Sequence, residues 1–193
     1  GWEYQLVKDE ARRRFALGAR LGAPYIVATP PLEQEGQEHL PGRYRDLLAI
    51  GREEGIRPTF EYISFFKSVS RLDDAWRIAQ ETGDPDATLI LDAFHTWNSG
   101  GTLNDLRAIP SDRISHYHID DADPAKPAHT QKDSDRVMIG DGQIDLGAEI
   151  AVLKDIGYDQ TMSLELFNAT LWEQDPLEVI SLGLERMKEL WAQ

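Results

Sequence analysis

Short apolar runs alternate with amphipathic segments along the whole chain. Buried strands read as apolar runs of about four to eight residues, whereas helices place apolar residues every three or four positions. Five strands are predicted on this basis, in residues 25–29, 57–62, 88–92, 113–119 and 161–167. Helices are predicted in residues 3–21, 44–54, 72–82, 103–107, 146–156 and 176–192. This alternation is typical of a parallel sheet in an α/β domain.

Several predicted strands end on a side chain that can bind a metal or move a proton. The run Thr88-Leu89-Ile90-Leu91 leads without a polar interruption into Asp92, as in a strand that is buried on both faces. Glu61, His118 and Glu165 lie at or near the ends of three other strands. An open five-stranded sheet and part of a closed (β/α)8 barrel both fit the pattern. The polar strand ends favour the barrel, because barrel strands converge on one mouth.

The length of the chain fits part of a barrel. A complete barrel of this kind usually takes about 250 residues, and this chain has 193. We therefore expect residues 1–193 to form a single domain that supplies the last five strand–helix units, with the first three strands absent. Such an open barrel would expose two sheet edges, which is a route to association with a second copy or a partner chain.

The composition of the chain limits the kinds of molecule that we expect it to bind. Acidic residues outnumber basic ones by 34 to 20, and the formal net charge of -14 disfavours a nucleic acid partner. No apolar run approaches the roughly 20 residues that cross a bilayer, and the first residues do not resemble a signal segment. The chain has no cysteine and is not a disulfide scaffold. We expect a soluble, cytoplasmic protein that acts on a small molecule.

Three carboxylates and one imidazole at the ends of four successive strands form a candidate site for a divalent ion. They are Glu61, Asp92, His118 and Glu165. Oxygen-rich sets suit Mn2+ or Mg2+, and the imidazole also allows Co2+ or Zn2+. His116 shares a strand face with His118 and is a second candidate for the histidine ligand. We choose His118, which lies nearer to the carboxyl end of its strand.

Five segments resemble the successive motifs of a known family. They are Phe60-Glu61, Leu91-Asp92-Ala93-Phe94-His95, His118-Ile119-Asp120-Asp121, Asp135-Arg136-Val137-Met138-Ile139-Gly140-Asp141-Gly142 and Ser163-Leu164-Glu165-Leu166-Phe167. These motifs are similar to those of the sugar phosphate isomerase/epimerase family. That family belongs to the xylose isomerase-like TIM barrels, which include ketose 3-epimerases, inosose dehydratases and 3-dehydroshikimate dehydratases. The resemblance covers nearly the whole chain and implies an α/β barrel.

The resemblance also implies roles for individual residues. By position, the four strand-end residues would hold a divalent metal ion, for which we expect Mn2+. Glu61 and Glu165 would also move a proton, while His95 and Arg136 would contact substrate oxygens. Arg136 lies in the 25-residue stretch 120–144, which is too long for a plain connection and is predicted to be a functional loop. A metal chelated by a carbonyl and its neighbouring hydroxyl eases removal of the proton between them, and two carboxylates could act as base and acid.

The leading hypothesis is therefore a metal-dependent isomerase or epimerase acting on a sugar, a sugar phosphate or a cyclic keto-polyol. A lyase that dehydrates an inosose or 3-dehydroshikimate begins with the same proton abstraction and stays open. A non-catalytic sugar-binding or assembly subunit also stays open, because the family's first three strands are not in the sequence. DNA-repair endonucleases of the superfamily carry a histidine-rich zinc cluster, which five histidines and a net charge of -14 fit poorly.

Overall fold

The order of helices and strands follows the predicted alternation in the computed structural model, which describes residues 2–33 and 37–193. The helices are α1 (Trp2–Arg20), α2 (Leu40–Glu54), α3 (Leu72–Glu81), α4 (Ala93–Asn98), α5 (Leu103–Arg107), α6 (Leu146–Asp155), α7 (Ala169–Trp172) and α8 (Pro176–Ala192). The strands are β1 (Tyr25–Ala28), β2 (Arg57–Glu61), β3 (Thr88–Asp92), β4 (Ile114–Ile119), β5 (Asp121–Ala122), β6 (Arg136–Val137) and β7 (Thr161–Leu164). The 3-10 turns are η1 (Gln37–His39), η2 (Ser111–Arg113) and η3 (Asp133–Asp135).

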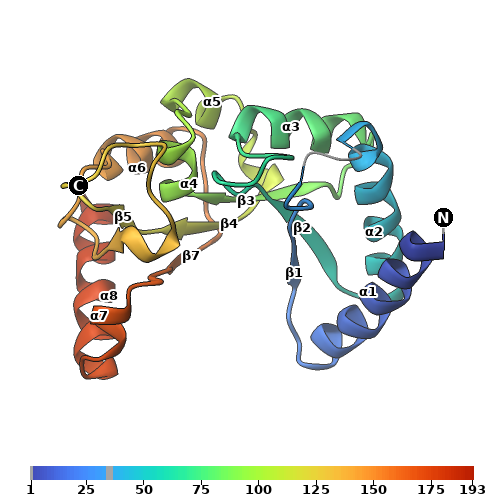
Figure 1. Ribbon diagram of the computed structural model, residues 1–193, viewed down its shortest axis with the longest axis horizontal. Helices are drawn as coiled ribbons and strands as arrows, with labels where there is room; N and C mark the ends of the chain where they lie inside the picture. The colour runs from blue at the N-terminus through green and yellow to red at the C-terminus, as the bar shows by residue number, and fades with distance from the viewer. Residues whose placement is uncertain (1, 34–36) are drawn as a thin grey trace.

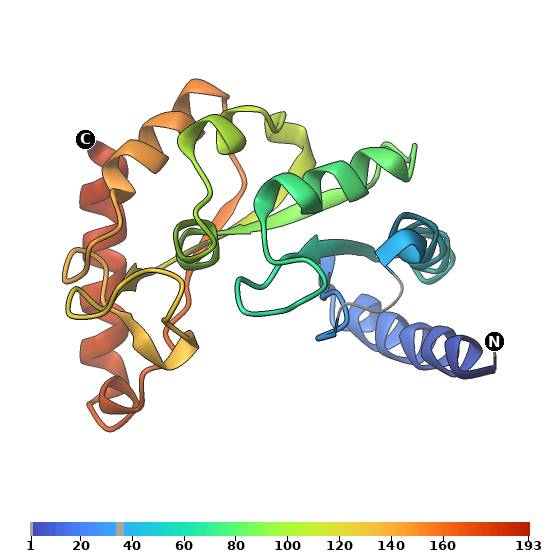
Figure 2. The same cartoon turned by 45° about the horizontal axis from the view of Figure 1, so that its top comes forward.

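Five strands form one parallel sheet in the order β1-β2-β3-β4-β7. Figure 1 shows this sheet curving into an arch, with α2, α3, α5 and α6 along its outer side. Figure 2 shows the arch open between α1 at one end and α8 at the other. The expected fold is confirmed as an α/β half-barrel, and within the described residues β1 and β7 are its two free edges. None of the helices in the described parts of the chain is long and apolar enough to cross a membrane.

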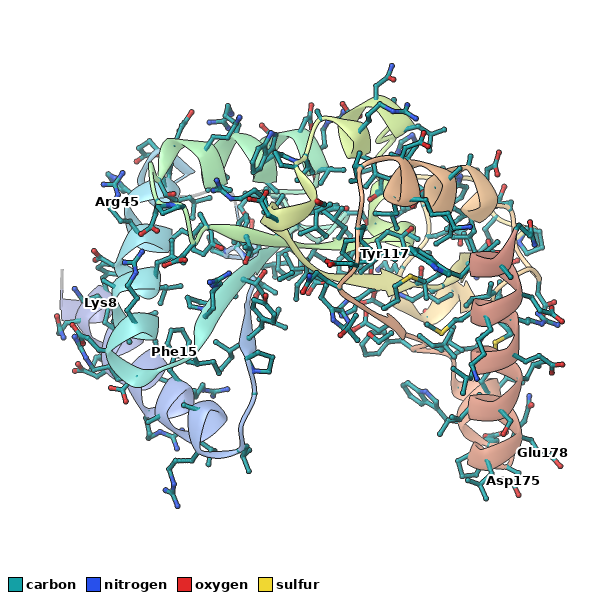
Figure 3. The ribbon with its side chains drawn as sticks, turned by 180° about the vertical axis from the view of Figure 1, so that it is seen from behind. Lys8, Phe15, Arg45, Tyr117, Asp175 and Glu178 are labelled. Atoms are coloured by element: carbon teal, nitrogen blue, oxygen red, sulfur yellow. The ribbon has the colours of Figure 1, made fainter. Side chains whose placement is uncertain are left out.

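The main hydrophobic core lies between the sheet and the outer helices. Leu89 and Leu91 of β3 are fully buried there, and Tyr117 of β4 is 1% exposed. Figure 3 shows Tyr117 in the middle of the molecule, whereas Phe15 lies on α1 at one end. Phe15 belongs to a second, smaller cluster with Ile50 and Ile56. The central strands are thus the most deeply packed part of the fold.

The largest differences from the predicted helices are the start of α2 and two short helices, α4 and α7, that were not predicted. The second helix begins at Leu40 and not at residue 44, because Pro41 in its first turn already has the backbone φ that a helix requires. The short helix α4 was not predicted, and it follows β3 directly. It begins where the Asp92 side chain accepts the backbone N–H of His95, which is an N-cap made by the last residue of the strand.

The predicted functional loop between residues 120 and 144 is ordered by a small ladder and a capped turn. Strands β5 and β6 pair antiparallel and fold the loop back on itself. The carboxylate of Asp121 accepts backbone N–H groups from Gly140 and Gly142, each at 3.1 Å, and from Ile144 at 2.9 Å. A Cβ at position 142 would overlap Asp121, so this turn requires glycine. The loop thereby carries Arg136 to the mouth of the half-barrel.

Candidate metal centre

The candidate metal centre lies at the carboxyl ends of four strands. Glu61 ends β2, Asp92 ends β3, His118 is the next-to-last residue of β4, and Glu165 directly follows β7. The sheet register pairs Asp92 with His118. One donor atom from each of the four side chains lies within 4.8 Å of the others. The structure therefore brings together the four predicted residues, and metal binding by them stays a prediction.

The imidazole of His118 stands among the three carboxylates. Its Nδ1 lies 2.9 Å from Glu61 Oε1, 3.3 Å from Glu165 Oε2 and 3.8 Å from Asp92 Oδ2. Burial alone lowers the pKa of His118, but hydrogen bonds to Glu165 and Glu61 outweigh it and raise the pKa to about 10. A proton on Nδ1 thus takes the place toward which the carboxylates point, and a divalent cation would compete with that proton.

The two most buried carboxylates of the cluster differ in their surroundings. Burial opposes ionisation of Asp92, yet the positive charge of Arg136 and the hydrogen bond from the backbone N–H of His95 hold the pKa of Asp92 below its usual range. For Glu61, burial prevails over its hydrogen bond with His118 and raises the pKa above the usual range. Asp92 is therefore held ionised by its neighbours, whereas Glu61 takes up a proton more readily.

The guanidinium of Arg136 is enclosed by acidic side chains and is 1% exposed. Its Nη2 lies 2.9 Å from Asp133 Oδ1 and 3.1 Å from His95 Nε2, and its Nε lies 3.3 Å from the same Asp133 oxygen. Its Nη1 contacts the three carboxylates of Asp92, Asp120 and Glu165. All three guanidinium nitrogens therefore have partners within the protein.

His95 is also engaged on both ring nitrogens. Burial lowers the pKa of His95, so its ring is neutral near pH 7. The ring Nε2 lies 3.1 Å from Nη2 of Arg136, and Nδ1 lies 3.4 Å from the backbone nitrogen of Ser64 and 3.1 Å from Ser64 Oγ. The structure thus places His95 and Arg136 beside the cluster, but only 2% and 1% exposed. Their contact with substrate oxygens stays a prediction, and it requires the pair to be uncovered.

Asp133 covers this pair and was not singled out from the sequence. Its side chain is 36% exposed, and its Oδ1 lies 3.9 Å from His95 Nε2. Burial raises the pKa of Asp133 to about 6, and the negative charges of Asp92 and Glu165 act in the same direction. The sequence feature that could have indicated this contact is the position of Asp133 three residues before Arg136. In a 3-10 turn this spacing places the two side chains together.

Two further residues support the cluster. Asp120 is fully buried, contacts Arg136 and accepts the backbone N–H of Phe94 at 3.1 Å, so it joins the long loop to α4. His116 lies below His118, where its Nε2 is 2.7 Å from Ser163 Oγ. As expected from its deeper position, His116 is hydrogen-bonded and stays outside the group of possible ligands.

The donor set fits a divalent ion. Three carboxylate oxygens and one imidazole nitrogen can approach a common point, since they lie within 4.8 Å of one another. Oxygen-rich sets with one nitrogen suit hard and borderline ions, and the chain has no cysteine to favour a soft one. The cluster is thus a chemically suitable site for such an ion.

A parallel half-barrel with carboxylates and a histidine at its strand ends defines a class of α/β barrel proteins. The chain belongs to one family of this class, the xylose isomerase-like TIM barrels, whose model matches residues 1–190. This membership confirms the resemblance seen in the sequence motifs.

Relatives within this family are enzymes. The chain is 29% identical over 177 residues to an inosose isomerase of Bacillus licheniformis, an alignment that covers 88% of this chain and 63% of that enzyme. It is 28% identical over 167 residues to a 3-dehydroshikimate dehydratase of Pseudomonas putida, covering 83% of this chain and 26% of that enzyme. The chain thus spans less than two thirds of the inosose isomerase.

A crystal structure of similar fold contains a metal. The structure described as the IOLI protein with a binding zinc atom superposes with a TM-score of 0.89 at 25% identity. The match covers 95% of this chain and 68% of that protein. The arch of Figure 1 therefore corresponds to about two thirds of a known barrel.

Proposed function

We propose that this protein is a metal-dependent isomerase or epimerase that acts on a neutral keto-polyol by proton transfer next to a carbonyl. The observation that carries the proposal is the convergence of Glu61, Asp92, His118 and Glu165 within 4.8 Å. The inosose isomerase relatives support an inosose as the first substrate to test. Because the chain spans 63% of the length of the Bacillus licheniformis inosose isomerase, the activity of a whole barrel is part of this proposal.

The four clustered residues would hold the ion, for which we propose Mn2+, with Zn2+, Co2+ and Mg2+ as alternatives. When bound, the ion would polarise the substrate carbonyl and stabilise the negative charge that develops on its oxygen. The zinc in the IOLI structure supports a divalent ion at such a fold. Elemental analysis of protein purified without added metal would identify the ion.

Two carboxylates would move the proton. Glu165 is the most accessible of the four clustered side chains, at 30% exposed, whereas Glu61 is 8% exposed. They come from strands β2 and β7, which β3 and β4 separate, so they can reach a bound substrate from different directions. One carboxylate would take the proton from the carbon beside the carbonyl, and the other would return a proton to the substrate. His95 and Arg136 would orient the substrate oxygens.

The charges around the mouth favour a neutral substrate over a sugar phosphate. When His118 serves as a metal ligand, Arg136 is the cationic side chain that remains among the described contacts of the cluster. Arg136 is already paired with carboxylates. Apart from the ion itself, these contacts leave no cationic side chain to bind a phosphate group, although hydroxyl groups can still exchange hydrogen bonds with the carboxylates.

A lyase is the second candidate, and the dehydratase relatives are the observation that favours it. Dehydration would begin with the same proton transfer and differ in the departure of a hydroxyl from the adjacent carbon. Incubation of the metal-loaded protein with an inosose in D2O separates the two reactions. Isomerisation introduces deuterium without loss of water, whereas dehydration produces an unsaturated product that absorbs in the ultraviolet.

Replacement of Glu165 by Gln tests the proton transfer. The change Glu165→Gln keeps one oxygen donor and removes the basic carboxylate, so we expect deuterium incorporation to fall about 10²- to 10⁴-fold. Metal affinity, measured by calorimetric titration, should fall much less. The matched control is Glu185→Gln on α8, an exposed glutamate remote from the cluster. Full deuterium exchange by the Glu165→Gln protein would exclude the two-carboxylate mechanism.

A further inference from the structure

Asp133 occupies the side of Arg136 that faces the open mouth. On the other side, Nη1 of Arg136 contacts Asp92 and Asp120, both fully buried, and Glu165. The Nε and Nη2 atoms instead share Asp133 Oδ1. Among these four carboxylate partners Asp133 has the most exposed side chain, at 36%. A substrate oxygen can therefore reach Arg136 most directly where Asp133 now stands.

We propose that Asp133 is a specificity-determining residue that admits neutral polyhydroxy ketones to the mouth and excludes substrates that carry a carboxylate or phosphate beside Arg136. This inference rests on the proposed function, because it concerns the substrate of the same site. The two groups of relatives are named for a neutral inosose and for the anionic 3-dehydroshikimate. The inference assigns the choice between these two classes of substrate to one side chain on η3.

The charges around Arg136 give the physical reason. An anionic group could pair with Arg136 only by displacing Asp133, and it would then meet the negative charges of Asp92, Asp120 and Glu165. Like charges brought together at such a site strongly disfavour binding. With Asp133 in place, the one guanidinium is already outnumbered by its four carboxylate partners.

A hydroxyl group meets no such penalty. It can accept a hydrogen bond from Arg136 and donate one to Asp133. The Oδ2 atom of Asp133 makes no hydrogen bond within the part of the chain that the structure describes, so it is available as an acceptor. The arrangement therefore recognises a group that both donates and accepts, which a carboxylate or phosphate dianion cannot do at this position.

The variant Asp133→Asn removes the charge and keeps an oxygen that can accept from Arg136. Calorimetric titration of the Zn2+-loaded full chain with an inosose and with 3-dehydroshikimate measures the two affinities. We expect the ratio of 3-dehydroshikimate affinity to inosose affinity to rise at least about tenfold, which corresponds to about 1.4 kcal/mol. A second variant, Asp133→Ser, should shift the ratio in the same direction and shows that the lost charge, not the new amide, is the cause.

The matched control is Asp135→Asn on the same turn. Asp135 pairs with Lys126 and does not contact Arg136, so its removal changes net charge equally without uncovering the guanidinium. The control should leave the affinity ratio unchanged. An equal shift in the control would show a general charge effect, and an unchanged ratio in both Asp133 variants would show no role for the residue. Either result overturns the inference.

Deuterium exchange distinguishes this inference from the proposed function. If the parent protein exchanges deuterium into an inosose but the affinity ratio does not respond to Asp133, the function stands and the selectivity role is wrong. If the ratio shifts as expected without deuterium exchange, the selectivity role stands and the proton-transfer function is wrong. Failure of both ligands to bind the parent and variant proteins would overturn both.

Discussion

The centre and the edges of the sheet are built differently. All five residues of β3 are buried, whereas Val27 of edge strand β1 is 48% exposed and Thr161 of edge strand β7 is also exposed. The same contrast runs through the site, because Asp92 is fully buried and Glu165 is 30% exposed. One part of the cluster is therefore fixed by the core, while the other lies on an edge that is open to solvent and substrate.

Asp92 and Glu165 also differ in how much of the fold depends on them. Asp92 caps α4 through the backbone N–H of His95 and accepts from Arg136 at 2.8 Å. Glu165 uses its carboxylate only toward His118 and Arg136 among the described residues. Asp92, at the centre of the sheet, therefore supports the fold as well as the cluster. The side chain of Glu165, at the edge, contacts His118 of the cluster and Arg136 beside it and caps no helix among the described residues.

Truncation of an apolar side chain should show the largest difference between centre and edge. Leu91 of β3 is fully buried, so Leu91→Ala should lower the free energy of unfolding by about 2–5 kcal/mol. The matched change on the edge, Val27→Ala, removes a half-exposed side chain and should cost less than about 1 kcal/mol. Urea denaturation measures both values. Equal losses would mean that the edge is covered in solution, for example by another copy of the chain.

The effect of removing Asp92 should come next in size. We expect Asp92→Ala to lower metal affinity by more than about 100-fold, since losing a ligand costs at least as much as losing a residue that supports one. It should also lower the free energy of unfolding by about 0.5–2 kcal/mol through loss of the α4 cap. Calorimetric metal titration and urea denaturation test the two effects separately. Unchanged metal affinity would remove Asp92 from the proposed ligands.

A pH-dependent effect concerns Glu149, which lies behind the centre of the sheet. This carboxyl on α6 accepts a hydrogen bond from Tyr117, and burial raises the pKa of Glu149 from 4.5 to about 8. Between these two pH values the folded state keeps the proton and the unfolded state releases it. Stability should therefore fall with rising pH, by up to about 1.4 kcal/mol per pH unit.

The variant Glu149→Gln tests this dependence because it keeps an acceptor for Tyr117 and cannot ionise. Its unfolding free energy should change less between pH 5 and pH 8 than that of the parent protein, as measured by urea denaturation at each pH. Glu185→Gln, at an exposed position on α8, serves as the control. A parent protein as stable at pH 8 as at pH 5 would show that Glu149 is already ionised when buried.

The fold could be predicted because the centre of the sheet has a clear sequence signature. The run Thr88-Leu89-Ile90-Leu91 before Asp92 contains only residues suited to a buried strand, and the structure has β3 at the predicted bounds. The edge strand is less distinct, since β7 ends at Leu164 and not at residue 167. With no strand on its outer side among the described residues, β7 has fewer partners to extend it.

The site was predictable where it depended on strand ends and not where it depended on the loop. Parallel strands that each end on a polar residue must bring these residues to one edge, so the cluster followed from the sequence. The covering of Arg136 by Asp133 depends on the ladder of β5 and β6 and on a 3-10 turn, and two-residue strands leave no periodic pattern. Burial of His95 by these contacts could not be foreseen for the same reason.

The strand order also has a consequence for how the chain folds. In the parallel sheet, β2, β3 and β4 each pair with the strand that precedes them in the sequence. The last strand, β7, pairs with β4, and the strands β5 and β6 of the small ladder lie between these two in the sequence. No pairing joins the first parallel strand to the last within the described residues. Chains dominated by pairings between consecutive units close short loops and reach the folding transition state faster than chains that must first bring their ends together. The sheet can thus grow unit by unit, and the cluster is complete only when β7 has docked.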